Sequence, residues 1–185
     1  MKERLYEILM DNDVVSSIRN NYDELVKIIP ELKKMKGCKH NHPYHHLDVW
    51  EHTLYALSFA RSDFIIRLSL LLHDLGKPYV MTTDENGVNH FKGHPQKSFE
   101  LALDILKRLG FDNNTIGKVC YLVRYHDEPI TEENLDIDIE TERLRFHVQY
   151  CDSLAHNPNI LYKKEKYLDK TNEMIDKYLS SHYHK

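Results

Sequence analysis

Histidine and aspartate occur in this chain at positions where apolar side chains are expected. His73 and Asp74 directly follow the apolar run FIIRLSLLL of residues 64–72. His52 lies within the run VWEHTLYALSFA, and Asp152 stands at helical spacing from Val148. Buried imidazole and carboxylate groups are costly unless they are paired or bind a metal ion. A shared cation resolves that cost, so the pattern indicates a metal site.

A structural interpretation of these histidines is weighed first. A single histidine on an apolar helix face is more often a core residue with satisfied hydrogen bonds than a metal ligand. The adjacent pair His73-Asp74, followed by Leu-Gly-Lys, is harder to explain in this way, because two polar groups fall where burial is deepest. We therefore interpret the pair as functional. A helical bundle whose histidines are only structural would hold no transition metal tightly.

The composition limits the class of protein. With 185 residues, of which 41% are hydrophobic, the chain fits one compact domain. A net charge of -4 argues against a broad nucleic-acid surface and favours a small ligand. No apolar run reaches the roughly 20 residues of a membrane span, and the N-terminus is polar, so a cytoplasmic protein is expected. The three cysteines have no C-x-x-C spacing and are expected to be free, buried thiols.

Helical periodicity recurs throughout and predicts an all-α bundle. The expected helices are 3–18, 22–29, 49–60 after an N-cap at Asp48, 64–72, 95–109, 113–126 and 140–157. An amphipathic helix at 160–180 is expected to close the bundle. Gly76 is expected to stop the helix before it, and 79–93 to form a loop or short hairpin around Asn86-Gly87. Asp136 and Asp138 are placed in an acidic loop.

The order His52, His73-Asp74, Asp152 resembles the H...HD...D signature of the HD-domain metal-dependent phosphohydrolases. The similarity is greatest to the HD region of the tRNA nucleotidyltransferase and poly(A) polymerase group. It is carried by PELKKMKGC, YHHLDVWEHTL, LLLHDLGKP, FKGHPQKSFELALDILKRLGF and VRYHDEPI. The resemblance implies a single HD domain over 1–185, with a core of about 45–157 and flanking terminal helices. No Gly-Ser followed closely by Asp-x-Asp lies upstream of these stretches, so nucleotide addition is not expected.

The resemblance also implies the metal ligands. The first ion would be held by His52, His73, Asp74 and Asp152. His94 and His126 would hold a second ion, with Asp74 bridging the two. Mixed imidazole and carboxylate ligation suits manganese, iron, cobalt, nickel or zinc better than calcium. His94 can instead cap a helix, and His126 beside Asp127 can be an exposed pair, so one or two ions remain open.

Other candidate residues surround these ligands. Lys77 follows Asp74 by three residues and is a candidate to contact a phosphate and assist catalysis together with Asp74, although a solvated lysine at a helix end is an equally ordinary interpretation. His45 is a candidate for substrate binding. The roles of four further histidines cannot be ranked from position alone: His40, His42, His46 and His90.

The expected function is hydrolysis of a phosphoester in a small nucleotide, either a phosphomonoester or a 2',3'-cyclic phosphodiester, by metal-activated water. Hydrolysis of dinucleoside polyphosphates or deoxynucleotides is an alternative within the same class. A nucleotide- or RNA-binding module that retains the fold without catalysis is the alternative from another class. The partner expected in each hydrolase case is a small phosphoester, and the sequence leaves the oligomeric state open.

Overall fold

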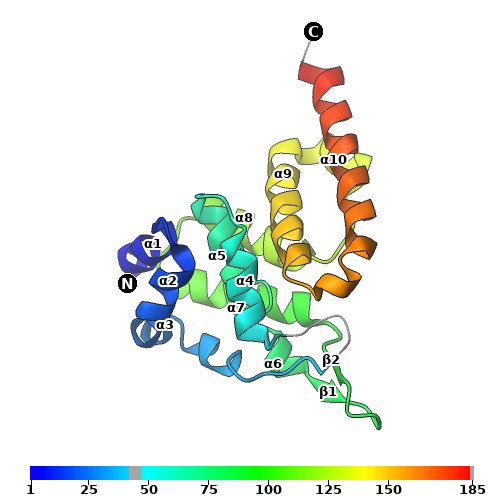
Figure 1. Cartoon of the computed structure of the whole chain (residues 1–185). Helices are drawn as coiled ribbons and strands as arrows, with labels where there is room; N and C mark the ends of the chain where they lie inside the picture. The colour runs from blue at the N-terminus through cyan, green and yellow to red at the C-terminus, as the bar shows by residue number, and fades with distance from the viewer. Residues whose placement is uncertain (42–46, 184–185) are drawn as a thin grey trace.

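The computed structural model describes residues 1–41 and 47–183, and the prediction of an all-α protein is confirmed (Figure 1). The helices are α1 (Lys2–Met10), α2 (Val14–Asn20), α3 (Tyr22–Ile28), α4 (Val49–Ser58), α5 (Phe64–Leu72), α6 (Lys77–Val80), α7 (His94–Arg108), α8 (Asn113–Tyr125), α9 (Glu132–Leu154) and α10 (Tyr162–Tyr183). Two 3-10 turns, η1 (Pro30–Lys34) and η2 (Pro158–Ile160), and a hairpin of β1 (Thr82–Thr83) and β2 (Asn89–His90) complete the described elements.

Helix α5 forms the centre of the main core. It is apolar on nearly every side and contacts α1, α4, α8 and α9. Figure 1 shows α5 in the middle, with α1, α2 and α3 on one side and α9 on the other. Because an apolar helix of this kind is stable in water only when it is covered all round, its neighbours are held around it. The C-terminal end of α5, where His73 and Asp74 stand, therefore lies deep in the protein.

Helices α9 and α10 form an antiparallel pair beside the main core (Figure 1). A second, smaller apolar cluster joins them through Leu135, Ile139 and Ile175. The final helix was expected to close the bundle. It is instead packed chiefly on α9 and η2, and its C-terminal end points away from the main core. Ile175 of α10 lies in the smaller cluster that it shares with α9.

Several predicted helix boundaries are confirmed because local chemistry sets them. The carboxylate of Asp48 accepts a hydrogen bond of 2.8 Å from the backbone N–H of Glu51 and caps α4. Gly110 has φ +72° directly after α7, a conformation that glycine adopts without steric cost. The hairpin expected within 79–93 forms, with Gly87 at φ +77° in its turn. The three cysteines are free and buried, as expected.

Two helix predictions are wrong. The helix expected over 3–18 is divided into α1 and α2, because Asp13 starts a new helix by accepting from the backbone N–H of Ser16. The acidic segment 132–138 belongs to α9 and is not a loop. Thr131 and Asn134 form a capping box at its start, and Asp138 interrupts it with φ -157° and ψ 84° while capping the turns that follow through Thr141.

The helix before Gly76 ends at Leu72, as predicted, but Gly76 is not the residue that stops it. Gly76 has φ -76° and ψ -21°, which are right-handed helical angles, and the short helix α6 starts immediately after it. Pro78 in the first turn of α6 has a φ that suits a helix start. Lys77 is thereby turned inward. Among the described residues, no helix is long and apolar enough to cross a membrane.

Candidate metal centre

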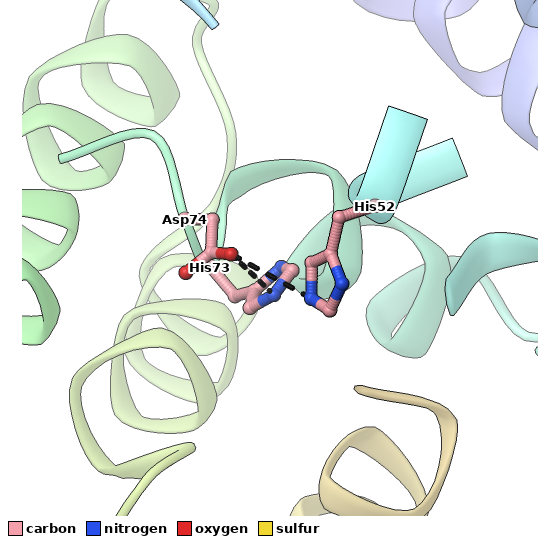
Figure 2. A group of neighbouring side chains, drawn as sticks. All are labelled: His52, His73 and Asp74. Atoms are coloured by element: carbon pink, nitrogen blue, oxygen red, sulfur yellow. Dashed lines mark ion pairs between the residues drawn. The ribbon is translucent and has the colours of Figure 1, made fainter. Parts of the chain in front are cut away.

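Three helices bring the first group of predicted ligands together. His52 comes from α4, the His73-Asp74 pair from the end of α5, and Asp152 from α9. Nε2 of His52 lies 2.7 Å from Oδ1 of Asp152 and 3.7 Å from Oδ2 of Asp74. Nε2 of His73 lies 3.4 Å and 3.3 Å from the same two oxygens. Figure 2 shows both imidazole rings turned toward the Asp74 carboxylate.

A second group meets the other oxygen of Asp74. Oδ1 of this carboxylate lies 3.2 Å from Nε2 of His94 and 3.9 Å from Nε2 of His126. The two Nε2 atoms lie 3.2 Å from each other. Asp74 therefore presents Oδ2 to the first histidine pair and Oδ1 to the second. Two sets of three residues, His52, His73 and Asp74 in one and Asp74, His94 and His126 in the other, each have their potential ligand atoms within 4.8 Å of one another, a spacing that can hold a metal ion.

The outer nitrogen of each of these four rings lies against a main-chain carbonyl. Nδ1 of His73 and His126 lie 2.7 Å from the oxygens of Leu70 and Val123. Those of His94 and His52 lie 3.1 Å and 3.3 Å from the oxygens of Phe91 and Ala155. A carbonyl only accepts, so each Nδ1 carries the proton and donates it. This arrangement orients Nε2 inward, as the outer hydrogen bonds of metal-binding histidines do.

The donor set fits a divalent cation. His73 and Asp74 are at most 1% exposed. Within the described residues, Nε2 of His73 and Oδ1 of Asp74 have no hydrogen bond of acceptable geometry. Buried polar atoms without partners are rare and costly, and the facing Nε2 atoms of His94 and His126 would repel each other with lone pairs alone. A cation between these atoms satisfies all of them.

The charges in the metal-free site also favour the binding of a cation. Burial alone would lower the pKa of His73, but the carboxylates of Asp74 and Asp152 outweigh burial and raise it to about 10. Burial would raise the pKa of Asp74, yet His73 and Lys77 hold it well below its usual range. Burial would likewise raise the pKa of Asp152, but the contacts with His52 and His73 hold it well below its usual range. The buried carboxylates thus attract positive charge, which a divalent ion provides.

Lys77 lies at the floor of the site and not in solvent, so the interpretation as a solvated lysine is wrong. Its side chain is buried, and Nζ donates to Oδ2 of Asp74 at 2.7 Å. Nζ also lies 3.2 Å from Nε2 of His40. Burial and then the charge of Lys77 lower the pKa of His40 to about 3, so its ring is neutral and Nε2 accepts from the ammonium. His40 therefore helps to fix Lys77.

A close helix contact places His94. The backbone of Gly76 touches the first turns of α7, where His94 stands. The N–H of Gly76 donates to the hydroxyl of Ser98 at 2.8 Å. Gly93 precedes the helix with φ +81°, so the chain turns sharply and brings His94 back over the His73-Asp74 pair. His94 is the first residue of α7, but Gly93 holds the N-cap position and no side chain caps the helix, so the capping interpretation is wrong. Nε2 of His94 lies at Asp74 instead.

A buried arginine holds the turn that carries His126. Arg145, on α9, donates from Nη1 to the carbonyl oxygens of Tyr125 and Glu128, on either side of His126. Its Nε donates to Oε2 of Glu142 at 2.7 Å, and both side chains are 2% exposed. His126 is buried and Asp127 is exposed. The prediction of an exposed pair therefore fails for His126 and holds for Asp127.

The two groups of ligands open into a cavity of about 590 Å³. Besides the predicted residues Asp74, Lys77, His94, His126 and Asp152, its lining includes several that were not among the predicted site residues: Phe91, Lys92, Asp127, His156 and Lys164. His156 is buried, and its Nδ1 lies 2.8 Å from the backbone oxygen of Asp152. The i, i+4 spacing of Asp152 and His156 on one helix end could have indicated that position.

His45 and the four histidines whose roles the sequence left open divide into three groups. His40 belongs to the site through Lys77. His90 is exposed and pairs with Asp84 at 2.8 Å, although its residue borders the cavity. His42, His45 and His46 lie outside the described residues, so the prediction that His45 binds substrate is not tested by the structure.

Comparison with known proteins gives one consistent result. A family model described as "HD domain" matches residues 44–173. The chain is 33% identical over 141 residues to the CC-adding tRNA nucleotidyltransferase of Thermus thermophilus, covering 72% of this chain and 32% of that protein. It is 35% identical over 104 residues to the A-adding tRNA nucleotidyltransferase of Deinococcus radiodurans, covering 53% and 24%. The chain spans about a third or less of the length of these relatives.

Proposed function

Because the chain belongs to the HD domain family, which is of the metal-dependent phosphohydrolase type, we propose that it hydrolyses a phosphoester bond of a small nucleotide. The proposed cofactor is one or two divalent transition-metal ions, held by His52, His73, Asp74 and Asp152 and by Asp74, His94 and His126. The observation that carries the proposal is the position of the Asp74 carboxylate, whose two oxygens face two separate histidine pairs.

The chemistry of such a site suits phosphoester cleavage. A divalent ion, when bound, lowers the pKa of a bound water towards about 7 and neutralises phosphoryl oxygens. The chain's own contribution is positioning. The carbonyl contacts at Nδ1 orient the four imidazoles, and Asp74 holds the geometry between the two groups. A buried site with fixed dipoles and charges stabilises the charge that develops during displacement at phosphorus.

Lys77 is proposed to bind the phosphoryl group that is transferred to water. Its ammonium is already fixed by Asp74 and His40, and its residue lines the cavity. An ammonium in a buried site donates strong hydrogen bonds to phosphate oxygens. Because the ammonium does not need to be ordered when substrate binds, its interaction is available to the transition state without an entropic cost.

The proposed substrates are nucleoside monophosphates and 2',3'-cyclic phosphates, followed by dinucleoside polyphosphates and deoxynucleotides. A cavity of about 590 Å³ lies within the size range of small-molecule sites. The partner is therefore a small phosphoester and not a long nucleic acid, in keeping with the net charge of -4. Nucleotide addition, named in the relatives, is not proposed for these residues.

A non-catalytic module that binds nucleotide or RNA is the second candidate. It is favoured by the names of the relatives, which act on tRNA and of which the chain matches one portion. It predicts ligand binding without turnover and no requirement for the Asp74 carboxylate.

The test combines metal content and turnover. Untagged protein is measured by elemental analysis, then reconstituted with manganese, iron, cobalt, nickel or zinc and assayed against the four substrate groups by phosphate release or chromatography. Bound metal and turnover, both lost in Asp74→Ala, are expected. Absence of any transition metal after reconstitution would reject the catalytic proposal in favour of the binding module.

A further inference from the structure

Two lysines at the mouth of the cavity have no acidic partner among the described residues. Lys92 follows β2, and Lys164 stands in the first turn of α10. Two surface cations of α7 and α8 are paired. Lys97 contacts Glu100 and Arg124 contacts Glu128, each at 3.1 Å. The ammonium groups of Lys92 and Lys164 make no such contact in residues 1–41 and 47–183, although they border the same cavity.

These lysines come from segments far apart in the chain. The first follows the hairpin between α6 and α7, and the second lies on the C-terminal helix, 72 positions later in the numbering. Lys164 and His156 both line the cavity, and Nδ1 of His156 lies 2.8 Å from the backbone oxygen of Asp152. The ring of His156 lies 5.4 Å from that of His52, between centroids. Lys164 therefore borders the side of the cavity near Asp152.

The cationic groups of the cavity differ in depth. Lys77 is buried at the floor and already bound to Asp74. Lys92 is exposed and Lys164 half-buried, so both stand nearer to solvent. A single phosphate bound beside Lys77 would leave the two outer lysines without a partner. A ligand with a second phosphate outside the first would satisfy them.

We propose that Lys92 and Lys164 bind a second phosphate of the substrate, beyond the phosphoryl group at Lys77. The inference rests on the proposed function for the identity of the inner group. Among the proposed substrates, the inference favours nucleotides with at least two phosphates over the nucleoside monophosphates and 2',3'-cyclic phosphates. Phe91 and Pro95 supply apolar surface in the same cavity, which suits a nucleoside part between polar ends.

The inference is tested by equilibrium binding, which does not require turnover. The metal-free protein is titrated with ADP and with AMP by isothermal titration calorimetry. The variants are Lys92→Gln, Lys164→Gln and the double variant. Lys166→Gln is the matched control, because Lys166 is an exposed lysine on the same helix that does not line the cavity.

Wild-type protein is expected to bind ADP more tightly than AMP. The double variant should lose about tenfold in ADP affinity and less than about twofold in AMP affinity, while the control changes neither. A wild type that shows no preference for ADP, including one that binds neither nucleotide, would overturn the inference. Equal loss for both nucleotides in the double variant would do the same, because it would indicate a general effect of charge.

The two proposals fail in different ways. If metal-loaded protein hydrolyses no nucleotide but the ADP preference depends on the two lysines, hydrolysis is rejected and the second phosphate site stands. If hydrolysis is found and the double variant retains its ADP preference, the second site is rejected and the hydrolase stands.

Discussion

Gly76 and Ser98 join the turn after the His73-Asp74 pair to helix α7 through a backbone N–H to hydroxyl hydrogen bond of 2.8 Å. A Cβ added at Gly76 would lie 2.5 Å from the backbone nitrogen of Ser98 and 2.6 Å from the backbone oxygen of His94. Both are main-chain atoms of a helix, so they cannot give way separately. The requirement for glycine here is therefore one of space and not of a left-handed conformation.

Gly76→Ala is expected to lower the free energy of unfolding by about 1–3 kcal/mol, the usual cost of overpacking a tight contact. The variant should also bind the second metal ion more weakly, because α7 carries His94. Urea denaturation and elemental analysis check the two effects. Gly117→Ala is the matched control, since Gly117 lies in α8 with open space around its Cβ position. It should stabilise the protein by about 0.5–1 kcal/mol. Equal stability of the two variants would contradict the packing argument.

The two oxygens of Asp74 predict a pattern of metal stoichiometry. His126→Ala should reduce bound metal from about two ions to about one per chain, because the first group keeps all its ligands. Asp74→Ala should abolish binding in both groups, since it removes one oxygen from each. Elemental analysis after reconstitution and desalting measures both. Retention of two ions in Asp74→Ala would reject a shared carboxylate.

Lys77 is expected to affect turnover more than metal content. In Lys77→Met the buried ammonium is replaced by a side chain of similar length without charge, and kcat should fall about 10²- to 10³-fold, as when a group that stabilises the transition state is removed. Metal stoichiometry should stay within the error of wild type. Lys164→Met provides a comparison at the cavity mouth, with its main effect expected on KM. Loss of metal from Lys77→Met would instead assign the lysine a structural role.

The pH dependence of stability can be examined at Cys120, away from the metal ligands. Burial raises the pKa of its thiol to about 11. The unfolded thiol loses its proton nearer pH 8.5, so the folded state binds this proton more tightly. The contribution is fully present below the unfolded pKa and is lost as pH rises from about 8.5 through about 11. Urea denaturation of wild type and Cys120→Ala between pH 7 and 10.5 should show a steeper alkaline decrease for wild type. Parallel curves for the two proteins would contradict the predicted contribution of the Cys120 thiol.

The buried pair of Arg145 and Glu142 predicts a large effect from a single change. Arg145→Met should cost about 3–5 kcal/mol, because it leaves Glu142 buried without its cation. Changing both residues, with Glu142→Leu in addition, should recover part of that loss. Metal titration should show weaker binding by the second group in both variants, since the turn around His126 loses its anchor. Full metal affinity in the double variant would show that the turn is held by other contacts.

The fold was predictable where its determinants are local. Asp48 caps α4, Gly110 terminates α7, and the apolar run 64–72 forms the central helix, all from chemistry within a few residues. The division between α1 and α2 was missed, although Asp13 is a recognisable cap. The break between the two helices is also stabilised by a residue far along the chain, because Arg67 donates to the carbonyl oxygens of Leu9 and Asp11. Such contacts depend on packing, which periodicity does not describe.

In the candidate site, the ligand residues were predictable from the sequence, whereas the placement of the lysines around them was not. Apolar spacing and the resemblance together indicated six ligand candidates, and the structure brings all six together in two groups around Asp74. Their role as metal ligands stays a prediction. The burial of Lys77 was missed because it depends on α6 and on His40, a residue 37 positions away. Lys164 gave no signal, since one lysine in a helix rich in lysine is indistinguishable from its neighbours before the tertiary structure is known.

The contact between His52 and Asp152 also determines when the site can form. Nε2 and Oδ1 of these residues meet across 100 positions of chain, so closing this loop requires most of the protein to have collapsed. A chain still growing on the ribosome lacks the last ligand until α9 has emerged. Metal would therefore bind late, after the chain has folded. An ion that binds only the folded state would slow its unfolding.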